Sequence, residues 1–286
     1  MNAEPILAVI AKIEWAKAEI EKLNTEIGKF FQRNPYKVRS RINSNGTEEI
    51  WSFHFRGVIP PMISVTCGNI MKNLREPLDN VLAAVSMLHR GTDTGVSFPF
   101  CSNIKDYESE LAKLEKLLPT GSTDLIRKAQ TYPGGNSHIR ALHFINRNDK
   151  HRARLIVLNL KNTFSMQSLI VHEGWMFQIG YNNGQNLIIN GPPAKIKPSF
   201  SRGAAIIKPC KSRPFIQFNP AVNGAEYEME FATTLPGTKF EAEIQPSFNI
   251  AFSEAPGLER EPIVVALHQM SQLVESIVLT LRDRFF

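Results

Sequence analysis

Apolar residues recur at alternating steps of three and four positions near both ends of the chain. The series at the start comprises Ile6, Val9, Ile13, Ala16, Ile20, Leu23, Ile27 and Phe30. The series at the end comprises Ile263, Leu267, Met270, Val274, Ile277 and Leu281. This spacing places the apolar side chains on one face of a helix. The pattern therefore predicts two long terminal helices, which pack either inside one helical bundle or across a homodimer.

A β-hairpin and a central helix are predicted after the first helix. Alternating runs at 36–42 and 49–56 flank Asn45-Gly46, a dipeptide typical of tight hairpin turns. A helical pattern then covers about 66–88. Pro77 inside it removes one backbone hydrogen bond and predicts a kink. Weaker helical patterns follow near 104–118, 122–130 and 137–150.

The pattern changes to short alternating runs between about 155 and 252. Residues 226–231 and 240–244 alternate strictly between charged and apolar side chains, as in strands with one solvated face. We therefore predict an α+β fold, in which a helical bundle packs with an antiparallel β-sheet. The hairpin near the N-terminus could extend this sheet. The predicted regions are a helical part with the hairpin (1–154), a basic β region (155–255) and a C-terminal helix that returns to the bundle (256–286).

The composition favours a soluble globular protein, with 286 residues, 43% of them hydrophobic and 21% charged. No apolar run approaches the length of a membrane span, and no secretory signal is visible at the N-terminus, so no membrane partner is expected. Three widely spaced cysteines favour reduced thiols and a cytoplasmic location. Phosphate-loop, dinucleotide-binding and hydrolase motifs are missing from the sequence, and no histidine spacing suits zinc, so neither a cofactor nor a metal is expected.

Positive charge is concentrated in one part of the chain. Between Lys150 and Ala225 ten lysines and arginines are accompanied by one acid, Glu173, whereas the whole chain has a net charge of +6. Phenylalanines are interleaved with these cations, as in proteins that bind single-stranded nucleic acid. The alternative is a solvated loop with ordinary core phenylalanines. The candidate ligand-binding residues here are Lys195, Lys197, Arg202, Lys208, Lys211 and Arg213.

A second candidate site combines the central helix with the polar segment 146–152. His151 is the best candidate for proton transfer, because neighbouring cations disfavour its imidazolium form. Arg75 and Asp79 lie four positions apart, so Arg75 could hold an anion while Asp79 orients His151. The alternative is a structural ion pair and a histidine that caps a helix end. The further candidate ligands are Asn73, Asn148, Asp149, Lys150 and Arg152.

Four short motifs carry a resemblance to known proteins. They are Asn73-Leu74-Arg75 with Leu78-Asp79, then Phe98-Pro99, Gln130-Thr131-Tyr132 and Asn146 to Arg152. Together they resemble a widespread family of uncharacterised bacterial proteins, and the arginine motif is similar to the signature of HEPN helical domains. Many HEPN domains are metal-independent ribonucleases in which Arg and His from two subunits face the scissile phosphate.

This sequence departs from the HEPN pattern at its central residue. The family has histidines where this chain has Lys72 and Asn80, and an asparagine cannot act as a general acid or base. The resemblance therefore implies a non-catalytic or weakly catalytic binder of RNA or another anionic ligand. The alternatives are a ribonuclease with a toxin or defence role that uses His151 and Arg75, a small-anion binder, and a structural protein that binds a partner.

Overall fold

The computed structural model describes residues 4–55, 59–149, 156–172, 175–182, 186–190, 205–206, 227–234, 236, 239–252, 255, 257–258 and 261–286. The chain forms two compact units. The helical unit consists of Met1–Lys29, Pro60–Ile156 and Ile250–Phe286, and the β unit consists of Phe30–Ile59 and Val157–Asn249. The predicted α+β class, with helices in a bundle and antiparallel strands, is confirmed.

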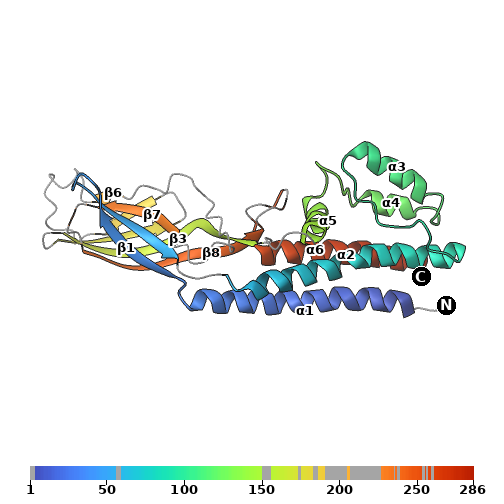
Figure 1. Ribbon diagram of the computed structural model, residues 1–286, viewed down its shortest axis with the longest axis horizontal. Coiled ribbons are helices and arrows are strands. Elements are labelled where there is room, and N and C mark those ends of the chain that lie inside the picture. The colour runs from blue at the N-terminus through green and yellow to red at the C-terminus, as the bar shows by residue number, and fades with distance from the viewer. Residues whose placement is uncertain are drawn as a thin grey trace. The chain divides into compact units, whose positions relative to one another are not determined.

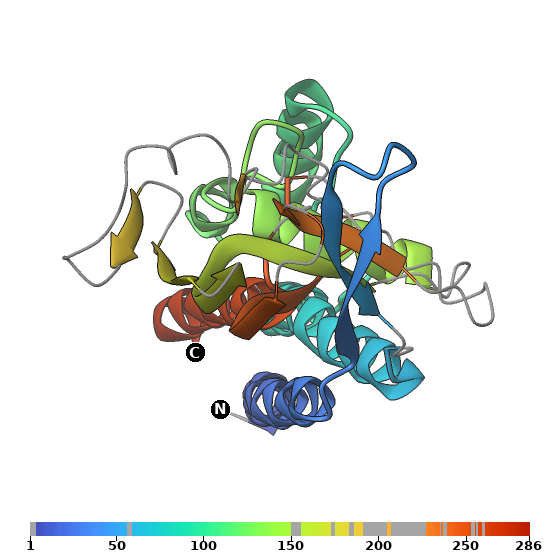
Figure 2. The ribbon, with the colours of Figure 1, turned by 90° about the vertical axis from the view of Figure 1, so that its left-hand side faces the viewer.

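Three long helices build the helical unit: α1 (Glu4–Gln32), α2 (Pro61–Arg90) and α6 (Ile263–Phe285). Figures 1 and 2 show α1 alongside α2 and α6. The terminal apolar series face inward, and residues such as Ile13 and Met270 are almost fully buried. The two series therefore pack inside a single chain, and burial of their apolar surface is the main stabilising contribution to the bundle.

Ion pairs border the packed face of α1. The Lys12 Nζ atom lies 2.6 Å from Glu76 of α2, and the Lys17 Nζ atom lies 2.5 Å from Glu275 of α6. These side chains are about one-third exposed, so each pair contributes little free energy.

The helix α2 is longer than the sequence predicts and continues as a helix through the buried Pro77. Its N-terminus begins at the Pro60-Pro61 pair, where a proline is tolerated because the first helical amides have no intrahelical partner. Its C-terminus ends at Gly91, whose φ of 72° is a left-handed conformation that favours glycine.

By length and composition α6 is apolar enough to cross a membrane, a property that core helices of globular proteins share. One face of α6 is buried in the helical unit. The buried residues are Ile263, Ala266, Leu267, Met270, Ser271, Val274, Val278 and Leu281. We interpret α6 as a core helix, because this face packs against α2 and α5.

Three shorter helices complete the unit: α3 (Ile104–Leu114), α4 (Ser122–Arg127) and α5 (Ser137–Asp149). The helix α5 packs on α2 and α6, and α4 contacts α3 and α6. The Tyr107 hydroxyl of α3 is buried and donates a hydrogen bond of 2.7 Å to the Ile126 carbonyl of α4. This bond ties α3 to α4.

The buried Tyr107 hydroxyl should make the stability of the protein depend on pH in the alkaline range. Burial raises the pKa of its hydroxyl far above the usual range. The folded protein therefore holds this proton more tightly than the unfolded chain, and stability should fall as pH rises above about 10. In Tyr107→Phe this loss should become smaller, at a cost of about 1 kcal/mol near neutral pH for the missing hydrogen bond. Urea denaturation at pH 8 and pH 10.5 measures both effects, and an undiminished alkaline loss in the variant would contradict the assignment.

The predicted hairpin consists of β1 (Tyr36–Ile42) and β2 (Glu49–Phe55), with Gly46 at a φ of 71° in the turn. Beyond the hairpin, β2 pairs with β7 (Tyr227–Thr234), which pairs with the short β6 (Ala205–Ile206). The hairpin thus extends the later sheet, as one of the sequence interpretations had it. It groups with the β unit, whereas the predicted region 1–154 had placed it with the helices.

The second sheet has the strand order β5-β4-β3-β8. Its strands are β5 (Asn186–Asn190), β4 (Trp175–Asn182), β3 (Ile156–His172) and β8 (Lys239–Phe252). The long strands β3 and β8 are neighbours in this sheet. In the chain, β3 follows α5 and β8 precedes α6. The chain therefore passes from the helical unit to the β unit at the start of β3, and returns to the helical unit near the end of β8.

Candidate functional site

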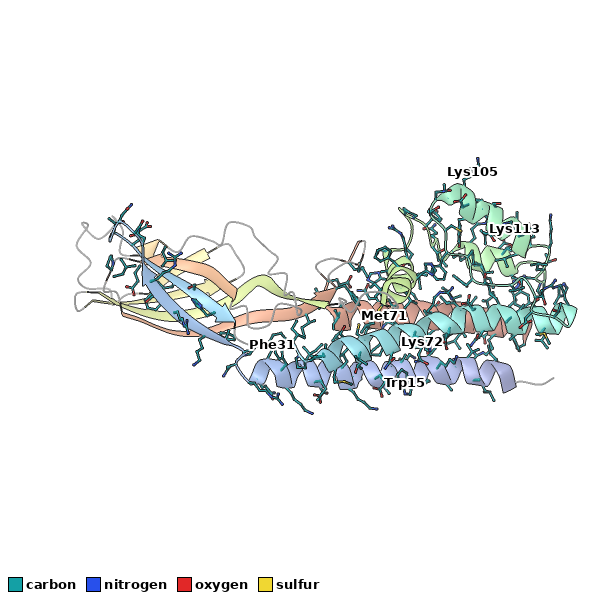
Figure 3. All side chains as sticks on the ribbon, viewed as in Figure 1. Trp15, Phe31, Met71, Lys72, Lys105 and Lys113 are labelled. Carbon is teal, nitrogen blue, oxygen red and sulfur yellow. The ribbon has the colours of Figure 1, made fainter. Side chains whose placement is uncertain are left out.

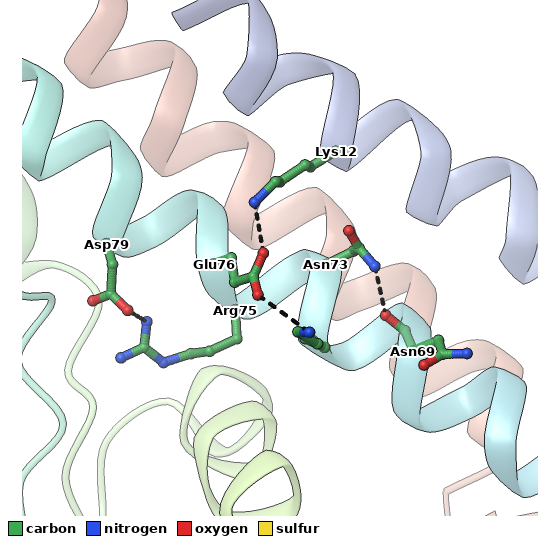
Figure 4. A network of polar contacts seen from close by, with 7 residues as sticks. Lys12, Asn69, Asn73, Arg75, Glu76 and Asp79 are labelled. Atoms are coloured by element: carbon green, nitrogen blue, oxygen red, sulfur yellow. Dashed lines mark hydrogen bonds and ion pairs between the residues drawn. The ribbon is translucent and has the colours of Figure 1, made fainter. Parts of the chain in front are cut away.

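Arg75 and Asp79 form an ion pair on one face of α2, as their spacing predicts. The Arg75 Nη1 atom donates a hydrogen bond of 2.5 Å to Asp79 Oδ2 (Figure 4). The Arg75 side chain is 13% exposed and that of Asp79 is 39% exposed. The other carboxylate oxygen, Oδ1, accepts the backbone N–H of Phe98 at 2.8 Å. Asp79 therefore joins α2 to the segment that follows it.

An aromatic ring covers the Arg75 guanidinium. The guanidinium carbon lies 4.2 Å from the centre of the Phe100 ring, and this ring stacks on His143 of α5 with the ring centres 4.4 Å apart. A cation over an aromatic face gains electrostatic attraction, more so where water is partly excluded. Arg75 is thus held by α2, by the segment 98–100 and, through Phe100, by α5. We call Arg75, Asp79, Phe98, Phe100 and His143 the Arg75 cluster.

Three of the four motifs that carry the family resemblance contact one another at or next to the Arg75 cluster. Phe98-Pro99 contacts Asp79 through the Phe98 amide, and the Thr131 hydroxyl donates a hydrogen bond to the Pro99 carbonyl. The last motif, 146–152, begins one helical turn after His143 on α5. Segments that are far apart in the sequence therefore lie in one part of the helical unit.

Sequence reasoning missed Phe100 and His143. The residues around each of them form no recognisable motif. The two positions are also far apart in the sequence, so helix or strand periodicity could not indicate that their rings are in contact. The one available signal was the position of Phe100 next to the Phe98-Pro99 motif.

The other candidate residues are placed as follows. Asn73 is partly exposed and donates a hydrogen bond of 3.0 Å to the Asn69 carbonyl of its own helix. Asn148 and Asp149 lie at the C-terminal end of α5, and nothing further is described of their side chains. The remaining candidates lie outside the described residues: Lys150, His151, Arg152, Lys195, Lys197, Arg202, Lys208, Lys211 and Arg213. The expected meeting of Arg75 with His151 stays a prediction.

The geometry suits binding of an anion better than proton transfer. Both carboxylate oxygens of Asp79 already accept hydrogen bonds, so this side chain is engaged as a structural partner. Arg75 uses one nitrogen for Asp79 and has a fork of five N–H donors in all. Asn80, the next residue after Asp79, is exposed, and its amide cannot act as a general acid or base at neutral pH.

The described residues also form a cavity that is not lined by the Arg75 cluster. A cavity of about 420 Å³ opens between α1 and the first turns of α2, and Leu23, Met62 and Ile63 contribute to its lining. Within the described ranges, no group of three or more histidine, cysteine, aspartate or glutamate side chains could hold a metal ion.

Comparison of the chain with models of known protein families, with curated proteins and with solved structures found no match. The resemblance described above therefore depends on the short motifs alone.

Proposed function

We propose that the protein binds RNA, or another polyanionic ligand, without cleaving it, and that its helical part is HEPN-like. The observation that carries this proposal is the segregation of charge, with ten cations and one acid between Lys150 and Ala225. Lysines and arginines that neutralise phosphates release counterions, which drives nucleic-acid binding with little dependence on sequence. A polyanion is the class of ligand that such a segment fits.

The Arg75 cluster supports an anchoring function for Arg75. Its guanidinium is fixed by Asp79 and Phe100, so little side-chain entropy remains to be lost when an anion binds. The polar segment 146–152 starts one turn beyond His143, which stacks on Phe100. We propose that a phosphate of the ligand is bound between Arg75 and this segment.

Binding without cleavage is favoured by the residues around Asp79. The family motif has a histidine at the position of Asn80, and Asp79 is engaged by Arg75 and the Phe98 amide. A general base must be able to accept a proton from the attacking group. Asn80 does not meet that requirement, and both oxygens of Asp79 already accept hydrogen bonds from the protein.

The test is fluorescence anisotropy with a labelled single-stranded RNA at several salt concentrations. We expect the logarithm of the affinity to fall linearly with the logarithm of the salt concentration. The triple replacement of Lys195, Lys208 and Lys211 by glutamine should weaken binding and reduce the slope by about 2, since each contact to a single strand contributes about 0.7.

The matched control replaces three exposed lysines of the helical unit, Lys105, Lys116 and Lys128, by glutamine; Lys105 is labelled in Figure 3. It removes the same charge and should retain the affinity and slope of the wild type. Wild-type protein that does not bind RNA at low salt would refute the proposal. The same RNA incubated with EDTA should stay intact; cleavage that disappears in folded His151→Ala would favour the ribonuclease alternative instead.

A homodimer also stays a prediction. The apolar series of α1 and α6, apart from the half-buried Ile277, are buried within one chain, so a dimer would use other surfaces. On the outer side of α1, Leu7 is 62% exposed and Trp15 is 42% exposed (Trp15 is labelled in Figure 3). Light scattering of the purified protein measures the oligomeric state.

A further inference from the structure

The cavity between α1 and α2 has the size of a small-molecule site. Its volume is about 420 Å³, and all the residues that line it belong to the helical unit. Leu23 of α1 and Ile63 of α2 contribute to the lining and are only 1% and 2% exposed, so its floor is apolar. Ligand sites in proteins typically have volumes of about 300–1,000 Å³ and mostly apolar walls with a few polar groups.

An exposed methionine lies at the opening of the cavity. Met62 also contributes to the lining, yet its side chain is 64% exposed. A methionine side chain is unbranched and flexible, and it adapts to apolar ligands of different shapes. A ligand with an apolar body would therefore bury Met62 together with the floor of the cavity.

Two lysines of α1 border the same cavity. Lys22 and Lys29 are two helical turns apart, about 10 Å along the helix. Each is paired with a glutamate three positions earlier, Glu19 at 2.6 Å and Glu26 at 2.7 Å. Exposed pairs of this kind contribute little free energy, so the ammonium groups can turn to another anion at small cost.

The accessible charge of the lining is positive. In the first pair the Lys22 side chain is 69% exposed and that of Glu19 is 18% exposed, so the ammonium group is the more accessible partner. The wall opposite α1 consists of Pro60, Met62, Ile63 and Thr66, and none of these residues is charged. An anionic head group therefore fits this rim better than a cationic one.

We propose that this cavity binds a small amphiphilic carboxylate, such as a fatty acid of medium chain length. Its alkyl chain would cover Leu23 and Ile63 and be closed off by Met62, and its carboxylate would pair with Lys22 or Lys29 at the rim. The extended chain of such an acid is comparable in length with the roughly 10 Å between the two lysines. The site is separate from the proposed binding of RNA and does not depend on it.

The first experiment is isothermal titration calorimetry of the full chain with decanoate, octanoate and decyltrimethylammonium. Octanoate should bind about 15-fold more weakly than decanoate, because each of the two missing methylene groups changes the affinity roughly fourfold. Decyltrimethylammonium has the same chain and the opposite charge, and should bind at least about tenfold more weakly than decanoate.

The second experiment uses variants of the cavity. Thr66→Phe should weaken decanoate binding at least about tenfold, because the ring occupies the cavity. Thr66 is partly exposed, so this variant should fold, which its thermal midpoint will verify. The double variant Lys22→Gln and Lys29→Gln should weaken decanoate about fivefold or more and leave the affinity for uncharged decanol unchanged. The matched control, Lys105→Gln with Lys116→Gln, removes equal charge from exposed positions of the same unit and should bind decanoate as the wild type does.

Each outcome decides the inference. Wild-type protein that does not bind decanoate at millimolar concentration would overturn it, and so would decanoate binding that is unchanged in folded Thr66→Phe. If decyltrimethylammonium binds as tightly as decanoate, the anionic head group is wrong. The RNA affinity of Thr66→Phe should equal that of the wild type, so failure of this inference leaves the proposed function intact.

Discussion

Replacing Asp79 by alanine should lower the free energy of unfolding by about 2 kcal/mol. The substitution leaves the Phe98 amide and the Arg75 guanidinium without the carboxylate that both contact. Breaking a fully buried ion pair costs more, about 3–5 kcal/mol. Here the Asp79 side chain is 39% exposed, so water replaces part of what is lost.

A neighbouring ion pair on α2 provides the control. Glu76 contacts Lys12 at 2.6 Å and Lys72 at 3.8 Å near the surface (Figure 4). Glu76→Ala should cost no more than about 1 kcal/mol, because exposed pairs contribute little. Urea denaturation of both variants measures the difference. Equal destabilisation would mean that the Phe98 bond and the low exposure of Arg75 are energetically unimportant.

A double-mutant cycle separates the ion pair from the rest of the cluster. If Arg75 and Asp79 stabilise each other directly, Arg75→Ala, Asp79→Ala and the double variant should give a coupling free energy of about 1 kcal/mol or more. The contact between Arg75 and Phe100 is lost in both Arg75→Ala and the double variant, so it cancels from the coupling free energy. An additive result would indicate that Asp79 acts mainly through the Phe98 amide.

Local patterns predicted the helices and the hairpin because each depends on residues close in sequence. The spacing of Ile13 and Ile20 specifies a helix face, and Asn45-Gly46 specifies a tight turn. The partner of β2 could not be derived in the same way. Its pairing with β7 joins segments far apart in the chain, and an alternating strand carries little information about which other strand it will contact.

In the candidate site, too, local contacts could be predicted from the sequence and long-range contacts could not. The spacing of Arg75 and Asp79 predicted their ion pair, since residues four apart lie on one face of a helix. The contacts from Phe98 and Phe100 depend on how the chain returns to α2 after Gly91, which tertiary packing decides. The stacking of Phe100 on His143 adds a third segment and has no counterpart in any sequence period.

The turn before α5 explains how two of the motifs are held together. The Asn136 N–H donates a hydrogen bond of 2.9 Å to the Gln130 carbonyl, and the Gly135 N–H donates one of 3.0 Å to the Tyr132 carbonyl. On one side of this turn Thr131 contacts Pro99, and on the other side the Asn136 side chain accepts the Ile139 N–H at the start of α5. The turn therefore links the segment 98–100 to the helix that carries His143.

Gly135→Ala should accordingly be among the most damaging single substitutions, with a loss of about 3 kcal/mol or more. A Cβ atom at position 135 would overlap the carbonyl oxygen of Gln130, a backbone atom that cannot move without opening the turn. The control is Gly28→Ala in α1, where a Cβ meets nothing within 4 Å.

Alanine at position 28 should stabilise the protein by about 0.5–1 kcal/mol, because it restricts the unfolded chain and favours the helix. The same kind of substitution should therefore change the thermal midpoint in opposite directions at the two positions. If Gly135→Ala leaves the midpoint unchanged, the turn opens without disturbing Thr131 or α5. The motifs would then not be coupled through it, and the Arg75 cluster would depend on the contacts of α2 alone.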